Sequence, residues 1–140
     1  MIQTVHLFLG RLIIKIKVIY FQGGNLMALK ELLELDDLNE VWEASEKKPV
    51  LLFKQSTTCP ISANAFSEFN NFLEDNGAAD VEAFFVKVRE TRPVSNQIAE
   101  DLGIQHQSPQ IFIVKDKEAV WNASHNKITV DSIKEALANA

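Results

Sequence analysis

The chain has 140 residues, the size of a single domain, and is 46% apolar and 24% charged, a composition that argues against a disordered or fibrous protein. A net charge of −5 argues against a protein that follows nucleic-acid phosphates. The single cysteine excludes an intrachain disulfide and a multi-cysteine zinc site, and the three histidines are widely spaced. We therefore expect a soluble domain of intracellular type with no metal site and one thiol to explain.

Residues 1–26 differ from the rest of the chain. They are apolar, and their only charged residues are Arg11, Lys15 and Lys17, whereas all nineteen acidic residues follow Met27. Three cations interrupt the stretch, which argues against a membrane helix, and the pattern of a signal peptide is absent. Residues 22–27 (QGGNLM) can be encoded by a sequence that contains a ribosome-binding site upstream of Met27. We expect residues 1–26 to be an upstream-translated extension outside the fold, which the intact mass of the native protein would test.

The remaining chain predicts one α/β domain. Two apolar runs, Val50–Phe53 and Val81–Val88, are typical of strands buried on both faces, and Pro60 between them is typical of a first helical position. Such a strand, helix and strand predict a parallel, right-handed unit. The expected elements are a short strand or helix lead-in over 29–35, a helix from its cap at Asp36 to about Ser45, the strand 50–53, a helix from Pro60 that Asn76 and Gly77 end, the strand 81–88, a helix over 94–102 ended by Gly103, antiparallel strands over 111–114 and 119–123, and a final helix over 131–137. The inward-facing side chains of the helices are expected to be Leu38, Val41, Trp42, Ala65, Phe66, Phe69, Phe72, Leu73, Ile133 and Leu137.

Cys59 is expected at the start of a helix, directly after a buried strand. A helix start favours an anion, so the thiolate should form more easily there than in a free cysteine. The flanking Thr58, Pro60 and Ser62 are typical of a polar helix start, although a lone cysteine can also be a small buried hydrophobe. Ser62 can donate a hydrogen bond to a thiolate but cannot form a disulfide, so any redox cycle must use an external thiol; it can equally be a solvated serine.

The pair Ser108-Pro109 is the second signal. It directly precedes the apolar strand expected from Ile111, and an X–Pro bond is cis in about 5–6% of cases. A cis bond would turn the Ser108 backbone toward an extended substrate beside the sulfur. The alternative is a trans proline that begins a strand.

These motifs together resemble the monothiol bacilliredoxins, the YtxJ-like family with a thioredoxin-like fold. The resemblance rests on Thr58–Ser62 (TCPIS) with His106–Gln110 (HQSPQ), includes Arg92–Asn96 and Ser124–Thr129, and covers residues 28–140. It implies an α/β fold with a central mixed sheet of four to five strands flanked by helices. Residues 1–26 have no counterpart in the family.

The resemblance implies a cytoplasmic thiol–disulfide oxidoreductase of redox homeostasis and the oxidative stress response. Its substrates would be S-bacillithiolated client proteins, with bacillithiol as co-substrate, a low-molecular-weight thiol as partner, no tightly bound cofactor, and neither nucleic acid nor membrane as partner. Cys59 carries over as the nucleophile and Pro109 as the cis-proline. Thr58, Pro60, Ser62 and Ser108 would support them.

The topology adds one inference of its own. The loop after the second parallel strand lies at the same sheet edge as Cys59, so Arg89 and Arg92 are predicted to lie near the site. Their guanidinium groups could pair with the carboxylates of bacillithiol, or they could be solvated surface charges. Two further pairs carry no predicted role: the histidines His106 and His125 are expected to be solvated, and Trp42 and Trp121 to belong to the core.

Two other functions stay open at this point. A monothiol glutaredoxin-like protein would share the fold, but its CGFS motif and Gly-Gly-x-Asp loop are absent from the sequence. A non-enzymatic thioredoxin-like stress protein or adaptor could carry Cys59 as a modifiable residue. Release of bacillithiol from a client by the wild type but not by Cys59→Ala would favour the enzyme.

Overall fold

The structure is a computed structural model that describes residues 2–9, 12–20, 26–58, 60–74 and 81–140, with side chains described from residue 29 onward. The elements are β1 (Ile2–Leu9), β2 (Leu12–Tyr20), β3 (Leu26–Glu31), α1 (Asp37–Lys47), β4 (Val50–Gln55), α2 (Pro60–Glu74), β5 (Glu82–Lys87), α3 (Arg92–Leu102), β6 (Gln110–Lys115), β7 (Glu118–Ser124), the short 3-10 helix η2 (His125–Lys127) and α4 (Val130–Ala138). Strands and helices therefore alternate from β3 to β6, as the sequence predicts.

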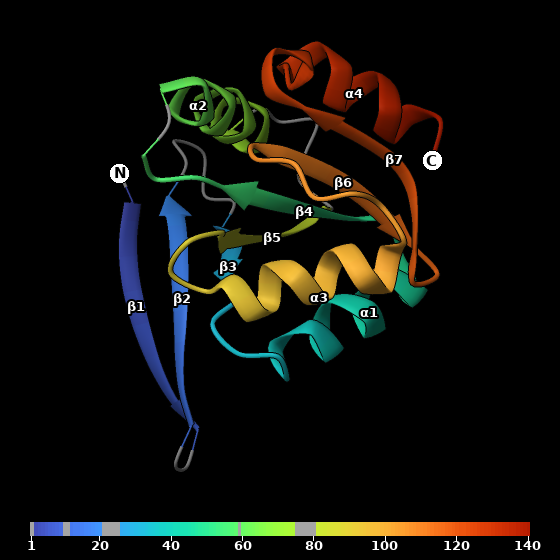
Figure 1. The fold of residues 1–140 in the computed structure, drawn as a ribbon. Helices are drawn as coiled ribbons and strands as arrows, with labels where there is room; N and C mark the ends of the chain where they lie inside the picture. Colours follow the sequence, from blue (N-terminus) through green and yellow to red (C-terminus); the bar gives the residue numbers. More distant parts are fainter. Residues whose placement is uncertain (1, 10–11, 21–25, 59, 75–80) are drawn as a thin grey trace.

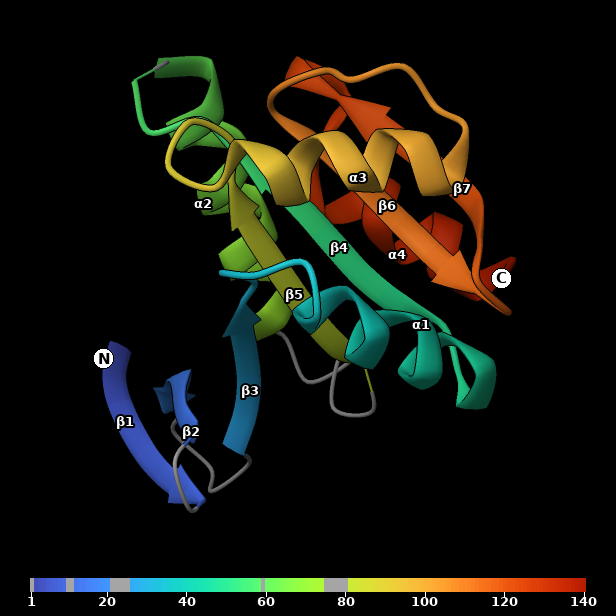
Figure 2. The same ribbon diagram turned by 60° about the horizontal axis from the view of Figure 1, so that its bottom comes forward.

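The strands form one mixed sheet with the order β1-β2-β3-β5-β4-β6-β7. β5 pairs in parallel with β3 and β4, and the other neighbours are antiparallel. Helices α2 and α4 cover one face of the sheet, and α1 and α3 cover the other (Figures 1 and 2). The predicted parallel strand–helix–strand unit, β4-α2-β5, is confirmed.

The central strand β4 joins two hydrophobic cores, because its successive side chains point to opposite faces. Phe53 belongs to the core under α2 and α4, where its ring stacks on that of Phe69 with a centroid separation of 4.9 Å. Leu52 belongs to the core under α1 and α3. Burying each such side chain stabilises the fold by roughly 1.5–3 kcal/mol, which holds the carboxyl end of β4 in place.

The helix ends confirm several predictions. Pro60 is the first residue of α2, and Gly103 ends α3 with a φ of 65°, a left-handed conformation that glycine adopts without strain. Helix α3 begins at Arg92, two residues earlier than expected, because Pro93 fits the first turn of a helix. The predicted stop at Asn76 and Gly77 lies outside the described residues.

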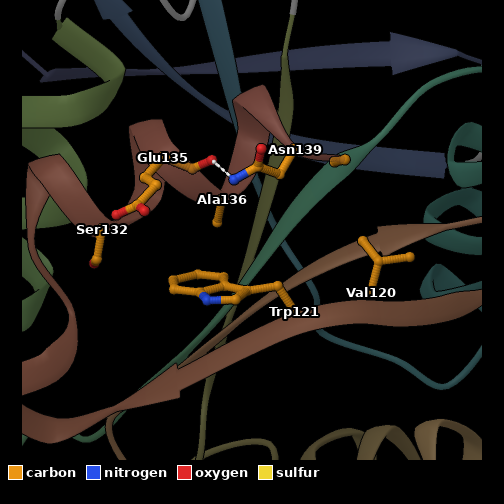
Figure 3. Close-up of a pocket in the computed structure, with 7 residues that line it drawn as sticks. Val120, Trp121, Ser132, Glu135, Ala136 and Asn139 are labelled. Carbon is orange, nitrogen blue, oxygen red and sulfur yellow. Dashed lines mark hydrogen bonds between the residues drawn. The ribbon is translucent and has the colours of Figure 1, made fainter.

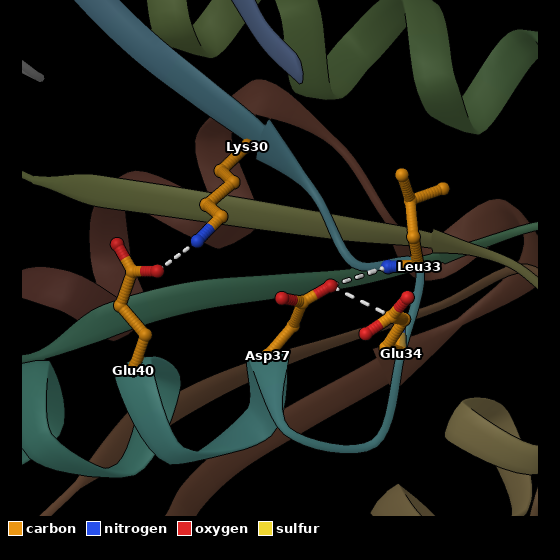
Figure 4. Close-up of polar contacts among 5 residues, drawn as sticks. All are labelled: Lys30, Leu33, Glu34, Asp37 and Glu40. Carbon is orange, nitrogen blue, oxygen red and sulfur yellow. Dashed lines mark hydrogen bonds and ion pairs between the residues drawn. The ribbon is translucent and has the colours of Figure 1, made fainter. Parts of the chain in front are cut away.

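The start of α1 differs from the prediction. The Asp36 side chain makes no capping hydrogen bond. The carboxylate of Asp37 instead accepts backbone N–H groups from Leu33 at 2.8 Å and Glu34 at 3.0 Å, which closes the turn before the helix (Figure 4). Asp36 is thus the cap residue by position only, and Asp37, already inside α1, stabilises the turn before the helix rather than capping the free N–H groups of the helix.

Among the expected inward-facing side chains of the helices, most are buried. Those that are only partly buried pack against the two cores and are Trp42, Phe66 and Leu137. Trp121 of β7 is also partly buried and packs against the core under α2 and α4. Both tryptophans thus border the cores, as expected.

The amino-terminal extension predicted over residues 1–26 contains two of the described strands. β1 and β2 form an antiparallel hairpin, and residues 16–20 of β2 pair with 26–30 of β3. The hairpin therefore extends the five-stranded sheet β3–β7 to seven strands. The β-branched run of β2 has high strand propensity, and the edge of β3 offers unpaired backbone groups. Translation from Met27 stays a prediction.

Within the part of the chain that the structure describes, no helix is both long and apolar enough to span a lipid bilayer.

Candidate active site

Four segments meet at the carboxyl end of the parallel strands. β4 and β5 end there, α2 begins there, and β6 starts beside β4 because Gln110 pairs with Lys54. The backbone N–H of Val88 donates to the carbonyl of Gln55 at 2.9 Å, which keeps the two strand ends together. Ligands of parallel sheets bind at such an edge, so this is where the predicted site residues should gather.

Cys59 itself lies outside the described residues, but both of its chain neighbours are described. Thr58 is exposed in the turn after β4, and Pro60 is the exposed first residue of α2. The predicted position of the cysteine between a strand and a helix agrees with these neighbours. Its reactivity stays a prediction.

Ser62 anchors the turn that leads into the cysteine. The side chain is fully buried, and its Oγ accepts the backbone N–H of Ser56 at 2.8 Å. It is therefore not the solvated serine of the alternative interpretation. One lone pair of the oxygen is used by the turn, and the hydroxyl proton remains able to donate. Donation to a thiolate stays a prediction.

The Ser108–Pro109 peptide bond is cis, as the resemblance implies. Pro109 is buried, and its carbonyl accepts the backbone N–H of His125 at 3.1 Å. This hydrogen bond ties the start of β6 to η2. The Oγ of Ser108 is buried and has no hydrogen-bond partner among the described residues. A polar atom is thus left free beside the cis bond.

The loop after β5 contacts the turn before Cys59. Arg89 Nη1 donates to Thr58 Oγ1 at 3.4 Å, and the Thr57 hydroxyl donates to a carboxylate oxygen of Glu90 at 2.8 Å. The Thr57 hydrogen bond is the largest of the causes that lower the pKa of Glu90. The structure therefore brings Arg89 beside a predicted site residue.

Arg92 lies at the start of α3. Its charge contributes to a lowered pKa of His106, after the larger effects of burial and of Lys54. Arg92 therefore lies on the His106 side of the site, whereas Arg89 contacts Thr58. Among the residues that the structure describes, no group of three or more His, Cys, Asp or Glu side chains is placed to hold a metal ion.

Sequence reasoning missed Lys54. Its side chain is fully buried at the end of β4, with Nζ 3.2 Å from Nδ1 of His106 and 5.7 Å from the centre of the Phe112 ring. Burial lowers the pKa of Lys54 to about 8. His106, predicted to be solvated, is exposed but bonded to this lysine. A charged residue that continues the apolar run Val50–Phe53 was the signal that could have revealed it.

Two of the surface pockets are formed by residues of η2, α2, β7 and α4. One lies beside the site between the start of α2 and η2 and is lined by Pro60, Ile61, Asn64, His125 and Asn126. The other lies between β7 and α4, where Trp121 faces Ala136 (Figure 3). The first pocket includes His125, which therefore borders the site.

Comparison with known proteins identifies the family. A family model described as monothiol bacilliredoxin BrxC matches residues 30–133. The chain belongs to the monothiol bacilliredoxin BrxC family. This bacilliredoxin is also similar to a solved structure described as a candidate oxidoreductase with a thioredoxin fold, at 37% identity, covering 77% of this chain and 92% of that one with a TM-score of 0.69.

Two thioredoxins show the same fold at lower identity. The Malassezia sympodialis thioredoxin Mala s 13 is 17% identical, with 78% of this chain and 87% of that chain covered and a TM-score of 0.61. Thioredoxin f from spinach chloroplast, short form, is also 17% identical, with 79% and 91% covered and a TM-score of 0.62. The thioredoxin-like fold is confirmed.

Membership of the family confirms the predicted activity. The bacilliredoxin is a monothiol thiol–disulfide oxidoreductase, and the reaction of its family is the removal of bacillithiol from proteins. The family match begins at residue 30, so it excludes the β1–β2 hairpin and includes every predicted site residue.

Proposed function

We propose that Cys59 is the nucleophile of this reaction. Its thiolate attacks the bacillithiol sulfur of a client mixed disulfide, so the client–bacillithiol S–S bond breaks as the Cys59–bacillithiol S–S bond forms. The client sulfur leaves with the electron pair of the broken bond and takes up a proton as a free thiol. The client is reduced, and the oxidised sulfur pair now includes Cys59.

A second exchange restores the enzyme. The sequence contains no other cysteine, so an external thiol must attack the Cys59–bacillithiol disulfide, and we assign this step to a low-molecular-weight thiol. If that thiol is bacillithiol, the products are the Cys59 thiolate and bacillithiol disulfide. Bacillithiol thus acts as a co-substrate, and since it is a cytoplasmic thiol the reaction takes place in the cytoplasm.

One observation carries this assignment: Thr58 and Pro60, the chain neighbours of Cys59, lie between the end of β4 and the start of α2, and β6 begins directly beside that end of β4. An extended client segment can pair with backbone groups at such a position. Ser62 supports the assignment because it fixes the turn before Cys59. Pro60 supports it by starting α2, whose amino end favours a thiolate.

The second part of the proposal assigns the carboxylates of bacillithiol to Arg89 and Arg92. Both residues are exposed, and neither is in an ion pair with a carboxylate among the described side chains. Arg89 contacts Thr58, the residue that precedes the nucleophile. A guanidinium group binds a carboxylate through two parallel hydrogen bonds, which would orient the bacillithiol moiety.

The nucleophile is tested with a bacillithiolated model client and Cys59→Ala. Mass spectrometry of wild type should detect one bacillithiol on Cys59 during turnover and a client that has lost it. Cys59→Ala should release bacillithiol no faster than buffer with the same thiol. Release by Cys59→Ala at the wild-type rate would exclude this function.

The arginines are tested with two clients that differ only in the attached thiol. One carries bacillithiol, and the other carries 2-mercaptoethanol, which has no carboxylate. The double variant Arg89→Ala/Arg92→Ala should lose about tenfold in kcat/KM for the first, which corresponds to about 1.4 kcal/mol, and little for the second. An equal loss on both clients would show that the arginines do not bind the carboxylates.

A further inference from the structure

Lys54 is buried without a counter-ion. Its side chain is fully inaccessible, and it takes part in none of the ion pairs between described residues, which join Lys30 to Glu40, Lys87 to Glu31 and Lys117 to Glu46. A buried ammonium without a carboxylate is unfavourable for the fold. A buried charge of this kind at the carboxyl end of β4 therefore indicates a role for Lys54 in the site.

The groups that face Lys54 are neutral or positive. His106 accepts its hydrogen bond, the ring of Phe112 lies on its other side, and Arg92 of α3 acts on the same histidine. Burial alone lowers the pKa of Lys54, and no neighbouring charge offsets it. Lys54 therefore places a positive charge at the carboxyl end of β4, two residues before the Ser56–Thr58 turn, rather than neutralising an acid.

The lysine also fixes the loop that leads to the cis bond. An ammonium has no lone pair to accept with, so while Lys54 is protonated Nδ1 of His106 must be the acceptor, and a neutral imidazole then carries its proton on Nε2. The Gln110 side chain accepts the backbone N–H of Gln107 at 3.1 Å and donates to the carbonyl of Gln105 at 3.3 Å. Lys54 and Gln110 are partners across the β4–β6 ladder, so together they hold residues 105–107 in place.

We infer that Lys54 is a positioning residue of the exchange reaction: through its hydrogen bond to His106 it holds the loop before Ser108–Pro109, and its buried charge stabilises the thiolate of Cys59. The inference rests on the proposed function, because it assigns Lys54 to the site of that nucleophile. An ammonium in a water-poor site acts more strongly on a nearby thiolate than one in bulk water.

The experiment measures the pH dependence of Cys59 alkylation by iodoacetamide in the full-length protein. The variants are Lys54→Met, which keeps an unbranched side chain one atom shorter and removes its charge, and Lys115→Met, a matched control at the exposed far end of β6. In Lys54→Met the apparent pKa of Cys59 should rise by about half a unit or more, with at least about a threefold lower alkylation rate constant at pH 7. Lys115→Met should match the wild type.

A folded Lys54→Met protein with the wild-type alkylation profile would overturn the inference. If Lys54→Met does not fold, Lys54→Arg provides the test, because arginine keeps its charge at every accessible pH. The wild-type profile should then show an inflection near pH 8, where Lys54 loses its proton, and Lys54→Arg should lack it. Identical profiles would overturn the inference.

The two proposals fail in different ways. If Cys59→Ala still releases bacillithiol from the client at the wild-type rate, the proposed function is wrong. If Cys59→Ala is inactive and Lys54→Met is folded with unchanged thiol acidity and unchanged client release, only the role of Lys54 is wrong.

Discussion

Replacing Lys54 with methionine should stabilise the protein, although we expect it to weaken the reaction. The pKa of Lys54 falls from its ordinary 10.5 to about 8 because the side chain is buried. A difference of that size corresponds to about 3 kcal/mol of unfavourable burial at pH 7. Loss of the hydrogen bond to His106 offsets about 1 kcal/mol of the gain. Lys54→Met should therefore be about 2 kcal/mol more stable than wild type at pH 7.

The sign of the pH dependence follows from the two protonation states. Below about pH 8 both folded and unfolded Lys54 bind a proton, so the whole burial penalty is present. Between about pH 8 and 10.5 the unfolded chain binds more protons than the folded one, so the stability of the wild type rises with pH. Lys54→Met lacks this rise, and its advantage over wild type should shrink across that window.

The assay is urea unfolding at pH 7 and pH 9.5, followed by the fluorescence of the two tryptophans. Lys115→Met serves as the control, and a substitution at its exposed position should change the free energy of unfolding by less than about 0.5 kcal/mol at either pH. A Lys54→Met protein less stable than wild type at pH 7, or an advantage that is the same at both pH values, would refute the reasoning.

Three further measurements test the contacts around the site and the last helix. Ser62→Ala leaves a buried backbone N–H without its acceptor and should lower the free energy of unfolding by about 1–3 kcal/mol, whereas Ser67→Ala on the exposed side of the same helix should be nearly neutral. Thr57→Val removes the main cause of the lowered pKa of Glu90, so the carboxyl titration followed by NMR should move to higher pH; an unmoved titration would contradict the contact. Thr129→Ala removes one half of the capping box of α4 and should destabilise the protein by about 0.5–2 kcal/mol in thermal unfolding.

The positions of the reactive motifs could be predicted because each depends on local chemistry. Pro60 lacks the amide hydrogen that a first helical residue does not use, and an apolar run such as Val50–Phe53 is typical of a strand buried on both faces. Pro109 directly before a buried strand pointed to the special peptide bond. These signals are contained in short stretches of sequence, so they can be recognised without knowledge of the fold.

Other features depended on partners that are distant in the sequence. Asp36 and Asp37 both have a side chain suited to capping, and only the path of the chain from β3 brings the backbone N–H groups of Leu33 and Glu34 to Asp37. The pairing of the β1–β2 hairpin with β3 likewise depends on an open strand edge that is formed elsewhere in the fold. Composition describes residues 1–26 correctly as unlike the rest, yet it contains no information on which strand edge is available.

The sequence by itself determined that this bacilliredoxin has one cysteine and no second one to pair with, a proline directly after that cysteine, and a proline before a later strand. Those facts depend on residue type and spacing alone. Only the tertiary structure decided that Lys54 lies buried against His106 and that Arg89 contacts Thr58, because these contacts join residues 52 and 31 positions apart. The charge environment of the site is therefore a property of the folded sheet edge, where several strand ends and loops converge.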